Sequence, residues 1–159
     1  MDNLVNIFAR NCEVARIDKA TAAAFLDSNH RLGATGSRYR YGLFVRRSTG
    51  SAEARLPEGT LVAVAVFSSA RCWKKGERMV RSFEWIRYAS LSGVRVTGGM
   101  SKLLDAFIAE QHPDDIMSYA DLNYPDGGRV YEKLGFQAEG EVCGEGYCNV
   151  KYRLKLTPW

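Results

Sequence analysis

Two adjacent glycines, Gly98 and Gly99, separate a stretch with strand character from a stretch with helix character. Downstream, apolar side chains recur at helical spacing until Pro113 ends the pattern; they are Met100, Leu103, Leu104, Phe107 and Ile108. A helix that begins at glycines presents free backbone N–H groups and the positive end of its dipole, which together favour a bound phosphate. The pattern therefore predicts a strand, a phosphate-binding turn and a helix. The alternative is a structural turn whose glycines only satisfy backbone dihedral angles.

The rest of the chain alternates between predicted helices and strands. One helix begins near Asp18, which is placed to act as its N-cap, and a short helix covers 128–134. Strands are predicted at 40–45, 61–68, 83–91 and 116–120, with a basic loop or hairpin tip at 69–81 and a closing hairpin at 137–156. This order predicts an α/β (α+β) fold with a mixed sheet. The length of 159 residues predicts a single domain over 1–159.

The composition is that of an ordinary globular protein, with 46% hydrophobic and 25% charged residues. No apolar run is long enough to cross a bilayer, and the first residues lack the order of a signal peptide. We therefore expect a cytoplasmic protein that does not associate with a membrane.

The four cysteines are scattered along a chain that is long enough to fold without disulfides; they are Cys12, Cys72, Cys143 and Cys148. We expect reduced thiols. No second cysteine pair stands at zinc spacing and the two histidines are far apart, so no metal site is expected.

The net charge of +4 is unevenly distributed. Residues 31–87 hold 12 basic and 4 acidic residues, a local balance of +8, and the remainder of the chain has a balance of −4. Such a basic segment is typical of a protein with an anionic partner, either a nucleic acid or a phosphorylated cofactor. A solvated, arginine-rich loop surface would produce the same charge pattern.

A second segment, from Val130 to Phe136, reads Val-Tyr-Glu-Lys-Leu-Gly-Phe. Together with the turn Arg95-Val-Thr-Gly-Gly-Met100, this Tyr-x-x-x-Gly-Phe segment resembles the GNAT superfamily of N-acyltransferases. The resemblance implies a mixed, mostly antiparallel central sheet flanked by helices. It also implies acetyl-CoA or another acyl-CoA, with its diphosphate held by Arg95, Val96, Thr97, Gly98, Gly99, Met100, Ser101 and Lys102. The family has a small residue where this chain has Met100.

The same resemblance implies roles for two side chains. Tyr131 would protonate the leaving thiolate, and Glu84, on the strand before the turn, would accept a proton from the attacking amine. The structural alternatives are a half-buried Tyr131 that packs its helix against the sheet, and a Glu84 paired with Arg81 or Arg87.

Three further segments resemble a branch of this superfamily from phages and mobile elements, which includes Mom-like DNA-modification proteins. They are His30-x-x-Gly33, Val96-x-Gly-Gly-x-Ser-Lys-Leu-Leu104 and Ser118-Tyr-Ala-Asp121. In that branch, His30, Ser118, Tyr119 and Asp121 would line the active cleft. For His30 the structural alternative is a surface group at the end of a helix.

Together these features predict an N-acyltransferase, in the first place an N-acetyltransferase, in which an amine of unknown identity attacks the thioester directly. Two alternatives stay open: a Mom-like enzyme that modifies nucleic-acid bases on the same scaffold, and a non-catalytic ligand-sensing module. The sequence does not decide between a monomer and a homodimer.

Overall fold

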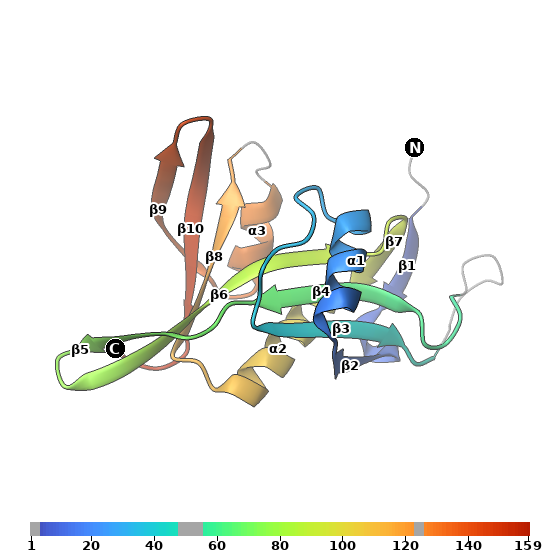
Figure 1. Cartoon of the computed structure of the whole chain (residues 1–159), viewed down its shortest axis with the longest axis horizontal. Helices are drawn as coiled ribbons and strands as arrows, with labels where there is room; N and C mark the ends of the chain where they lie inside the picture. Colours follow the sequence, from blue (N-terminus) through green and yellow to red (C-terminus); the bar gives the residue numbers. More distant parts are fainter. Residues whose placement is uncertain (1–3, 48–55, 123–125) are drawn as a thin grey trace. The chain divides into compact units, whose positions relative to one another are not determined.

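The computed structural model describes residues 4–47, 56–122 and 126–159 (Figure 1). The chain forms two compact units. Unit 1 consists of residues 1–67 and 87–111, and unit 2 of residues 68–86 and 112–159. The long strand β6 (Arg78–Ser90) contributes its first part to unit 2 and its last part to unit 1. The prediction of a single domain stays a prediction.

Unit 1 contains the elements on both sides of the glycine turn. In chain order they are β1 (Val5–Phe8), the 3-10 helix η1 (Ala9–Asn11), β2 (Cys12–Arg16), α1 (Lys19–Asn29), β3 (Tyr39–Val45), β4 (Leu61–Phe67), β7 (Val94–Thr97) and α2 (Gly99–Gln111). Unit 2 contains β5 (Arg71–Lys75), β8 (Asp115–Asp121), α3 (Asp126–Lys133), β9 (Gln137–Gly144) and β10 (Tyr147–Lys155), in addition to the start of β6.

Most strands pair in an antiparallel manner. The main sheet has the order β2-β3-β4-β6-β8-β10-β9, with β5 paired to β6 as a hairpin. The pair β6–β8 is parallel, with Glu84 opposite Met117, and β1 and β7 form a separate parallel pair. The predicted α/β fold with a mixed, mostly antiparallel sheet is therefore confirmed.

The core of unit 1 is built on β4 and α2. Every residue from Val62 to Phe67 is fully buried, as expected for an uninterrupted apolar run in an interior strand. The Phe67 ring stacks on Phe107 of α2 with 3.9 Å between ring centroids, and Tyr41 of β3 meets both rings edge-on. This aromatic cluster fixes α2, and with it the glycine turn at its N-terminus, against the sheet of unit 1.

The core of unit 2 lies between α3 and one face of its strands. Alternation along β8 buries Ile116, Ser118 and Ala120 on that face. The Tyr131 ring of α3 packs against Tyr152 of β10, with 5.6 Å between ring centroids. A Cβ at Gly128 would collide with the Tyr152 hydroxyl at 2.5 Å, so a glycine is needed where α3 meets β10.

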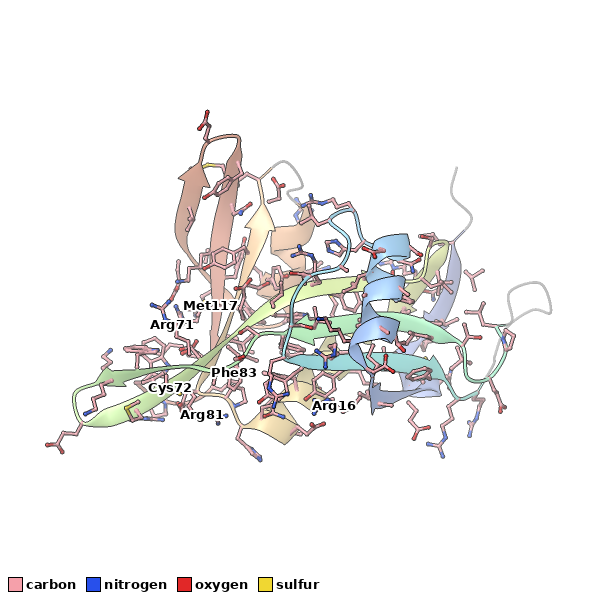
Figure 2. The ribbon with its side chains drawn as sticks, viewed as in Figure 1. Arg16, Arg71, Cys72, Arg81, Phe83 and Met117 are labelled. Atoms are coloured by element: carbon pink, nitrogen blue, oxygen red, sulfur yellow. A yellow bond between two sulfur atoms is a disulfide. The ribbon has the colours of Figure 1, made fainter. Side chains whose placement is uncertain are left out.

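The expectation of reduced thiols is wrong for two of the four cysteines. Cys143 and Cys148 form a disulfide across the β9–β10 hairpin, while Cys12 is buried and free and Cys72 is exposed and free (Figure 2). The hairpin register places the two cysteines directly opposite each other, with 4.1 Å between Cα atoms. That proximity depends on strand pairing, which the count and scatter of cysteines do not reveal.

Within the described ranges, no helix has the length and apolar character needed to span a membrane.

Candidate active site

The glycine turn leaves the start of α2 without intrahelical partners. The chain leaves β7, passes through Gly98 at a φ of +80°, and enters α2 at Gly99. The first helical hydrogen bond is donated by the Lys102 N–H to the Gly98 carbonyl, at 3.0 Å. The amides of Gly99, Met100 and Ser101 precede this bond, so the helix offers them no acceptor. They are three donors at the positive end of a thirteen-residue helix.

The two glycines are required for different reasons. Gly98 is exposed and has a left-handed backbone conformation, which is costly for any other residue. Gly99 is buried, and a Cβ there would meet the Tyr88 hydroxyl at 2.7 Å and Val96 Cγ1 at 3.1 Å. The turn therefore brings its backbone close to neighbouring atoms on one side and leaves it open on the other.

The open side faces a cavity of about 420 Å³. Its lining combines the turn with the N-terminal strand and 3-10 helix: Phe8, Ala9, Arg10, Thr97, Gly98, Ser101, Lys102 and Asp105. The Arg10 guanidinium lies over the Phe8 ring, 4.5 Å from its centroid, and adds a positive charge to this wall. Backbone donors, hydroxyl groups and a cation around a hollow suit an anionic ligand.

Met100 lies away from this cavity. It lines a second cavity of about 390 Å³ with Tyr88, Arg95 and Val96. Burial raises the pKa of Tyr88 to about 12, so its phenol stays neutral at ordinary pH. Methionine in place of the family's small residue therefore fills space on the far side of the turn and leaves the open side unobstructed.

Lys102 has contacts that differ from those expected of a phosphate ligand. Its ammonium group donates to the carbonyls of Ala9 and Cys12, at 2.9 and 2.6 Å. The backbone N–H of Lys102 is already bonded within the turn. Lys102 therefore joins α2 to η1 and holds the cavity wall in place. Thr97 uses its hydroxyl similarly, donating to the Asn6 side chain at 3.0 Å.

In unit 2, the buried Ser118 and the half-buried Tyr131 form a hydrogen-bonded pair. The Ser118 hydroxyl lies 2.7 Å from the Tyr131 hydroxyl and 2.9 Å from the Trp85 carbonyl oxygen. Ser118 is 1% exposed, and the Tyr131 ring packs edge-on against Trp85 with 6.1 Å between centroids. The sequence resemblance named both residues, and the fold brings them into direct contact.

The chain of hydroxyl groups has a defined proton arrangement. The Trp85 carbonyl can only accept, and Ser118 has one proton to donate. When Ser118 donates to Trp85, the Tyr131 phenol donates to Ser118; when Ser118 turns, it donates to the phenolic oxygen instead. Burial raises the pKa of Tyr131, the bond from Ser118 lowers it, and the charge of Glu84 raises it. The net pKa is raised, so the phenol retains its proton at neutral pH.

Glu84 lies on the opposite face of the sheet from Ser118. It pairs with Met117 on β8, and residues directly opposite in a ladder point to the same face, whereas Ser118 points to the other. Ser68 holds the Glu84 backbone, donating its N–H to the Glu84 carbonyl at 2.9 Å and accepting the Glu84 N–H at its hydroxyl at 2.8 Å. Desolvation raises the pKa of Tyr119, and the charge of Glu84 raises it further.

Asp121 is the last residue of β8 and is half-buried. Because it is three residues from Ser118, strand alternation puts the two side chains on opposite faces. The Ser118–Asp121 segment is therefore two groups: Ser118 on the Tyr131 face, and Tyr119 with Asp121 on the Glu84 face.

His30 belongs to unit 1, where it caps the C-terminus of α1. Its Nδ1 accepts the Leu32 N–H at 3.0 Å, which puts the ring proton on Nε2. Burial lowers the pKa of His30, and the charges of Arg87 and Arg31 lower it further. His30 is therefore a neutral imidazole at neutral pH.

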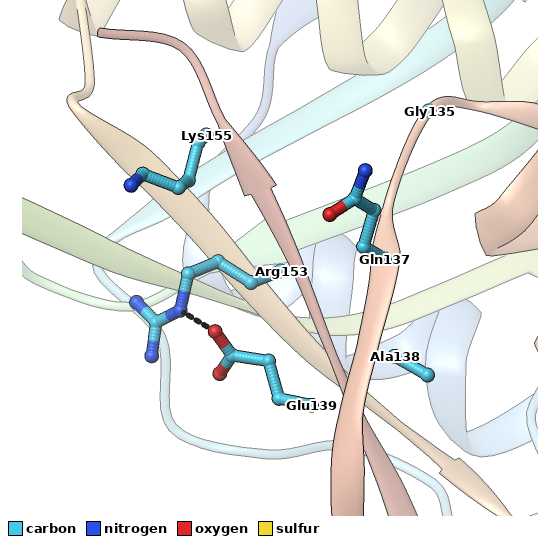
Figure 3. A pocket seen from close by; sticks show the side chains of 6 residues that line it. All are labelled: Gly135, Gln137, Ala138, Glu139, Arg153 and Lys155. Atoms are coloured by element: carbon cyan, nitrogen blue, oxygen red, sulfur yellow. Dashed lines mark hydrogen bonds and ion pairs between the residues drawn. The ribbon is translucent and has the colours of Figure 1, made fainter. Parts of the chain in front are cut away.

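A third cavity, of about 330 Å³, lies at the start of β9 (Figure 3). Arg153 in its wall donates to Glu139 at 2.8 Å and to Asp115 at 2.6 Å. Burial alone would lower the pKa of Arg153, but the two carboxylates outweigh burial and the net pKa is raised. Because its guanidinium is already neutralised, this cavity is a poor site for a phosphate.

Sequence reasoning missed three contributors to these sites. Arg10 lines the first cavity, the Tyr88 hydroxyl lies beneath Gly99, and the Trp85 carbonyl accepts the Ser118 proton. Tyr88 is four residues after Glu84 on the same predicted strand, so alternation puts both side chains on one face. This spacing was a usable signal for Tyr88. Nothing in the sequence points to Arg10 or to a backbone carbonyl.

No known protein-family profile matches the chain, and no curated protein matches it in sequence. Solved structures do match. One chain of the NatC complex, solved with Gag peptide and CoA, has a TM-score of 0.62 and 15% identity, covering 92% of this chain and 99% of that chain. A variant of the spermidine N-acetyltransferase SpeG from Vibrio cholerae has a TM-score of 0.63 and 11% identity, covering 92% and 94%. NAA60 from Arabidopsis thaliana, solved with a bisubstrate analogue, has a TM-score of 0.63 and 9% identity, covering 91% and 100%.

These likenesses extend over nearly the whole of each chain, at identities that establish the fold alone. The chain has the fold of these N-acetyltransferases.

Proposed function

We propose that this protein is a GNAT-type N-acyltransferase, in the first place an N-acetyltransferase, that moves an acyl group from coenzyme A to an amine. The observation that carries the proposal is the open glycine turn at the start of α2. The Gly99, Met100 and Ser101 amides have no acceptor within the helix, and Gly98 and Ser101 line a cavity of about 420 Å³. The fold shared with acetyltransferases supports it, and the NatC structure contains CoA.

The residues of the turn fit a diphosphate. Gly99, Met100 and Ser101 would offer backbone N–H groups, and the absence of a side chain at Gly98 leaves the approach open. Arg10 would add a positive charge from the cavity wall. Bound there, coenzyme A would supply an acyl group activated as a thioester.

In unit 2, Tyr131 would serve as the proton donor to the departing sulfur. Its raised pKa keeps the proton on the phenolic oxygen until negative charge develops on an acceptor. Ser118 would then turn its own proton toward the phenolate, which limits the cost of leaving a charge in a buried position. Ser118 is thus a positioning residue for Tyr131.

The proton of the attacking amine requires a separate acceptor, and we propose Glu84. The backbone of Glu84 is held by two hydrogen bonds with Ser68, one to its N–H and one to its hydroxyl. The Glu84 side chain shares its sheet face with Tyr119. The neutral imidazole of His30 in unit 1 and the carboxylate of Asp121 at the end of β8 are the second-rank candidates.

Calorimetric titration of the full chain tests the cofactor assignment. Acetyl-CoA and CoA should bind, whereas pantetheine, which lacks the diphosphate, should bind much more weakly. The absence of heat with acetyl-CoA up to millimolar concentration would contradict the proposal. Equal affinity for CoA and pantetheine would contradict the assignment of the glycine turn. Detectable acyl transfer to any amine would dismiss a purely ligand-sensing role.

A nucleic-acid acceptor, as in the Mom-like enzymes, is the second candidate. The observation that favours it is the β5–β6 hairpin, whose residues 71–81 include five basic residues and one acidic residue (Figure 2). Arg71, Lys74 and Lys75 are exposed there, while Arg78 is bonded to Asp114 at 3.0 Å. Retention on a DNA column that decreases with salt would support this acceptor, and no retention at low salt would exclude it.

The oligomeric state, monomer or homodimer, and a cytoplasmic location remain proposals. Light scattering on the purified chain measures the first, and fractionation of the source cells tests the second.

A further inference from the structure

The tip of the β9–β10 hairpin gathers three metal-ligating side chains outside the candidate active site. Cys143 of β9 faces Cys148 of β10 in the ladder, and the pairs Gly144–Tyr147 and Val142–Asn149 flank them on either side. Glu141 is two residues before Cys143, so alternation puts its side chain on the same face. One ligand atom from each of the three residues lies within 4.8 Å of the others.

We infer that, when the disulfide is reduced, this hairpin tip is a Zn²⁺ site formed by Cys143, Cys148 and Glu141. Two thiolates and a carboxylate are a ligand set that suits zinc better than magnesium or calcium. Metal–ligand bonds of about 2.0–2.3 Å put the ligand atoms of a tetrahedral site roughly 3–4 Å apart. The carboxylate of Glu141 already lies within 4.8 Å of both sulfur atoms, and the two sulfurs must move apart once the S–S bond is reduced. A water molecule completes the fourth position.

The strand ladder prepares the site in advance. The ladder fixes both cysteines from both sides, so little conformational freedom is lost on binding. The tip is also accessible. Glu141 and Cys143 are exposed and Cys148 is half-buried, and every residue of β9 is exposed. An ion and a small reductant can therefore reach the sulfur atoms.

The oxidised and metal-bound forms exclude each other. A dithiol reductant attacks one protein sulfur as its thiolate, breaks the S–S bond, and then displaces the second protein sulfur with its other thiol. The reductant leaves as a cyclic disulfide, having supplied two electrons and two protons to the protein. Zn²⁺ then replaces the protons of the two protein thiols, and both protons pass to solvent.

Either form cross-links β9 to β10 at the hairpin tip. The Cys148 carbonyl accepts the Leu122 N–H at 3.0 Å, so the tip is tied to the chain directly after Asp121. With the thiols reduced and no metal present, the tip loses its cross-link and is held by the ladder and the Leu122 hydrogen bond. The inference thus predicts three forms of one hairpin: disulfide, open dithiol and zinc-bound.

Cobalt provides the test, because Co²⁺ bound by thiolates has a characteristic charge-transfer absorption and Zn²⁺ bleaches it. The full chain with Cys72→Ser, which removes the exposed free thiol, is reduced with a dithiol, freed of reductant and titrated with Co²⁺. We expect one equivalent to bind with the thiolate band, Zn²⁺ to displace it, and the disulfide form to show no band.

Three variants decide the ligands. Cys143→Ser should abolish the band. Glu141→Gln should weaken Co²⁺ binding by more than the roughly tenfold that loss of an outer partner costs. Glu145→Gln, in the exposed turn of the same hairpin, is the matched control and should bind as the parent does. No thiolate band in the reduced protein, or equal affinity in the Glu141→Gln and Glu145→Gln variants, would overturn the inference. None of these readouts depends on acyl transfer.

Discussion

The roles proposed for the glycine turn of unit 1 and for the Tyr131–Ser118 pair of unit 2 depend on opposite features. The turn offers backbone amides, and its proposed role requires the absence of side-chain atoms at Gly98 and Gly99. The proposed role of the pair depends on two hydroxyl groups held 2.7 Å apart in a partly buried position. Addition of one carbon atom should therefore damage the first region, and removal of one oxygen atom the second. Five variants test this contrast, and one of them, Gly98→Ala, is a control.

The largest effect is expected from Tyr131→Phe. The phenylalanine ring can keep the contacts with Trp85 and Tyr152, but the proton donor is lost. We expect turnover to decrease by about 100- to 10,000-fold, the usual contribution of a general acid. The affinity for acetyl-CoA, measured by calorimetry, should stay unchanged. A variant with parental turnover would show that Tyr131 only packs its helix.

Gly99→Ala is expected to affect stability and cofactor affinity together. The added Cβ meets the Tyr88 hydroxyl at 2.7 Å, and overpacking of this kind costs about 1–3 kcal/mol. Urea unfolding measures that cost, and CoA titration measures the displacement of the amides. Gly98→Ala is the matched control, because a Cβ at residue 98 would lie 3.6 Å from the nearest atom, the Ala9 Cβ, and has room. The cost of this substitution comes from the left-handed backbone conformation and should be about 1–2 kcal/mol. If Gly99→Ala keeps parental stability and affinity, the close approach beneath the turn has no consequence.

Ser118→Ala should have a smaller effect on turnover than Tyr131→Phe. It leaves the Trp85 carbonyl without its hydroxyl partner, which costs about 1–3 kcal/mol of stability when a buried group loses its hydrogen bond. The phenol remains, so turnover should persist at a reduced level. Loss of turnover equal to that of Tyr131→Phe would make Ser118 a direct participant.

The smallest expected effects are shifts in the titration of Tyr131. A nearby negative charge disfavours the phenolate, so Glu84→Gln should lower the pKa of Tyr131, whereas Ser118→Ala should raise it by removing a donor. Since the proposed role of Tyr131 requires its protonated form, the alkaline decline of activity should move to higher pH in Ser118→Ala. Glu84→Gln also removes the proposed base, so its effect on the pKa of Tyr131 is read from absorbance rather than from activity. Absorbance of tyrosinate, with Tyr131→Phe as the blank, measures the pKa directly. Shifts in the same direction in both variants would contradict this electrostatic account.

Regions with strong local patterns were predicted well from the sequence. The apolar spacing and Pro113 predicted α2, which ends at Gln111, and Asp18 does cap α1 by accepting the Thr21 N–H at 2.7 Å. The unbroken apolar run of β4 predicted an interior strand. In each case the residues that determine the element lie next to one another in the sequence. The spacing of apolar and capping residues is therefore enough to predict the element.

Features that depend on pairing were not predicted. The sequence predicted a strand before the glycine turn, which is β7, but it did not indicate that the four-residue strand β1 pairs with it. The disulfide required the hairpin register, and the contacts of Lys102 required a 3-10 helix more than 90 residues earlier in the chain. By contrast, the placement of Ser118 and Asp121 on opposite faces of β8 follows from their odd spacing. The sequence resemblance grouped them in one cleft, although alternation alone would have separated them.

The two carbonyl contacts of Lys102 have a consequence for how the N-terminal residues are handled in the laboratory. Because the ammonium group anchors Ala9 and Cys12 to the long helix, the first strand and the short turn after it form part of the cavity wall rather than a dispensable arm. A tag placed before them should be harmless, whereas trimming the chain past Cys12 would open the hollow to solvent and leave a lysine charge without its acceptors.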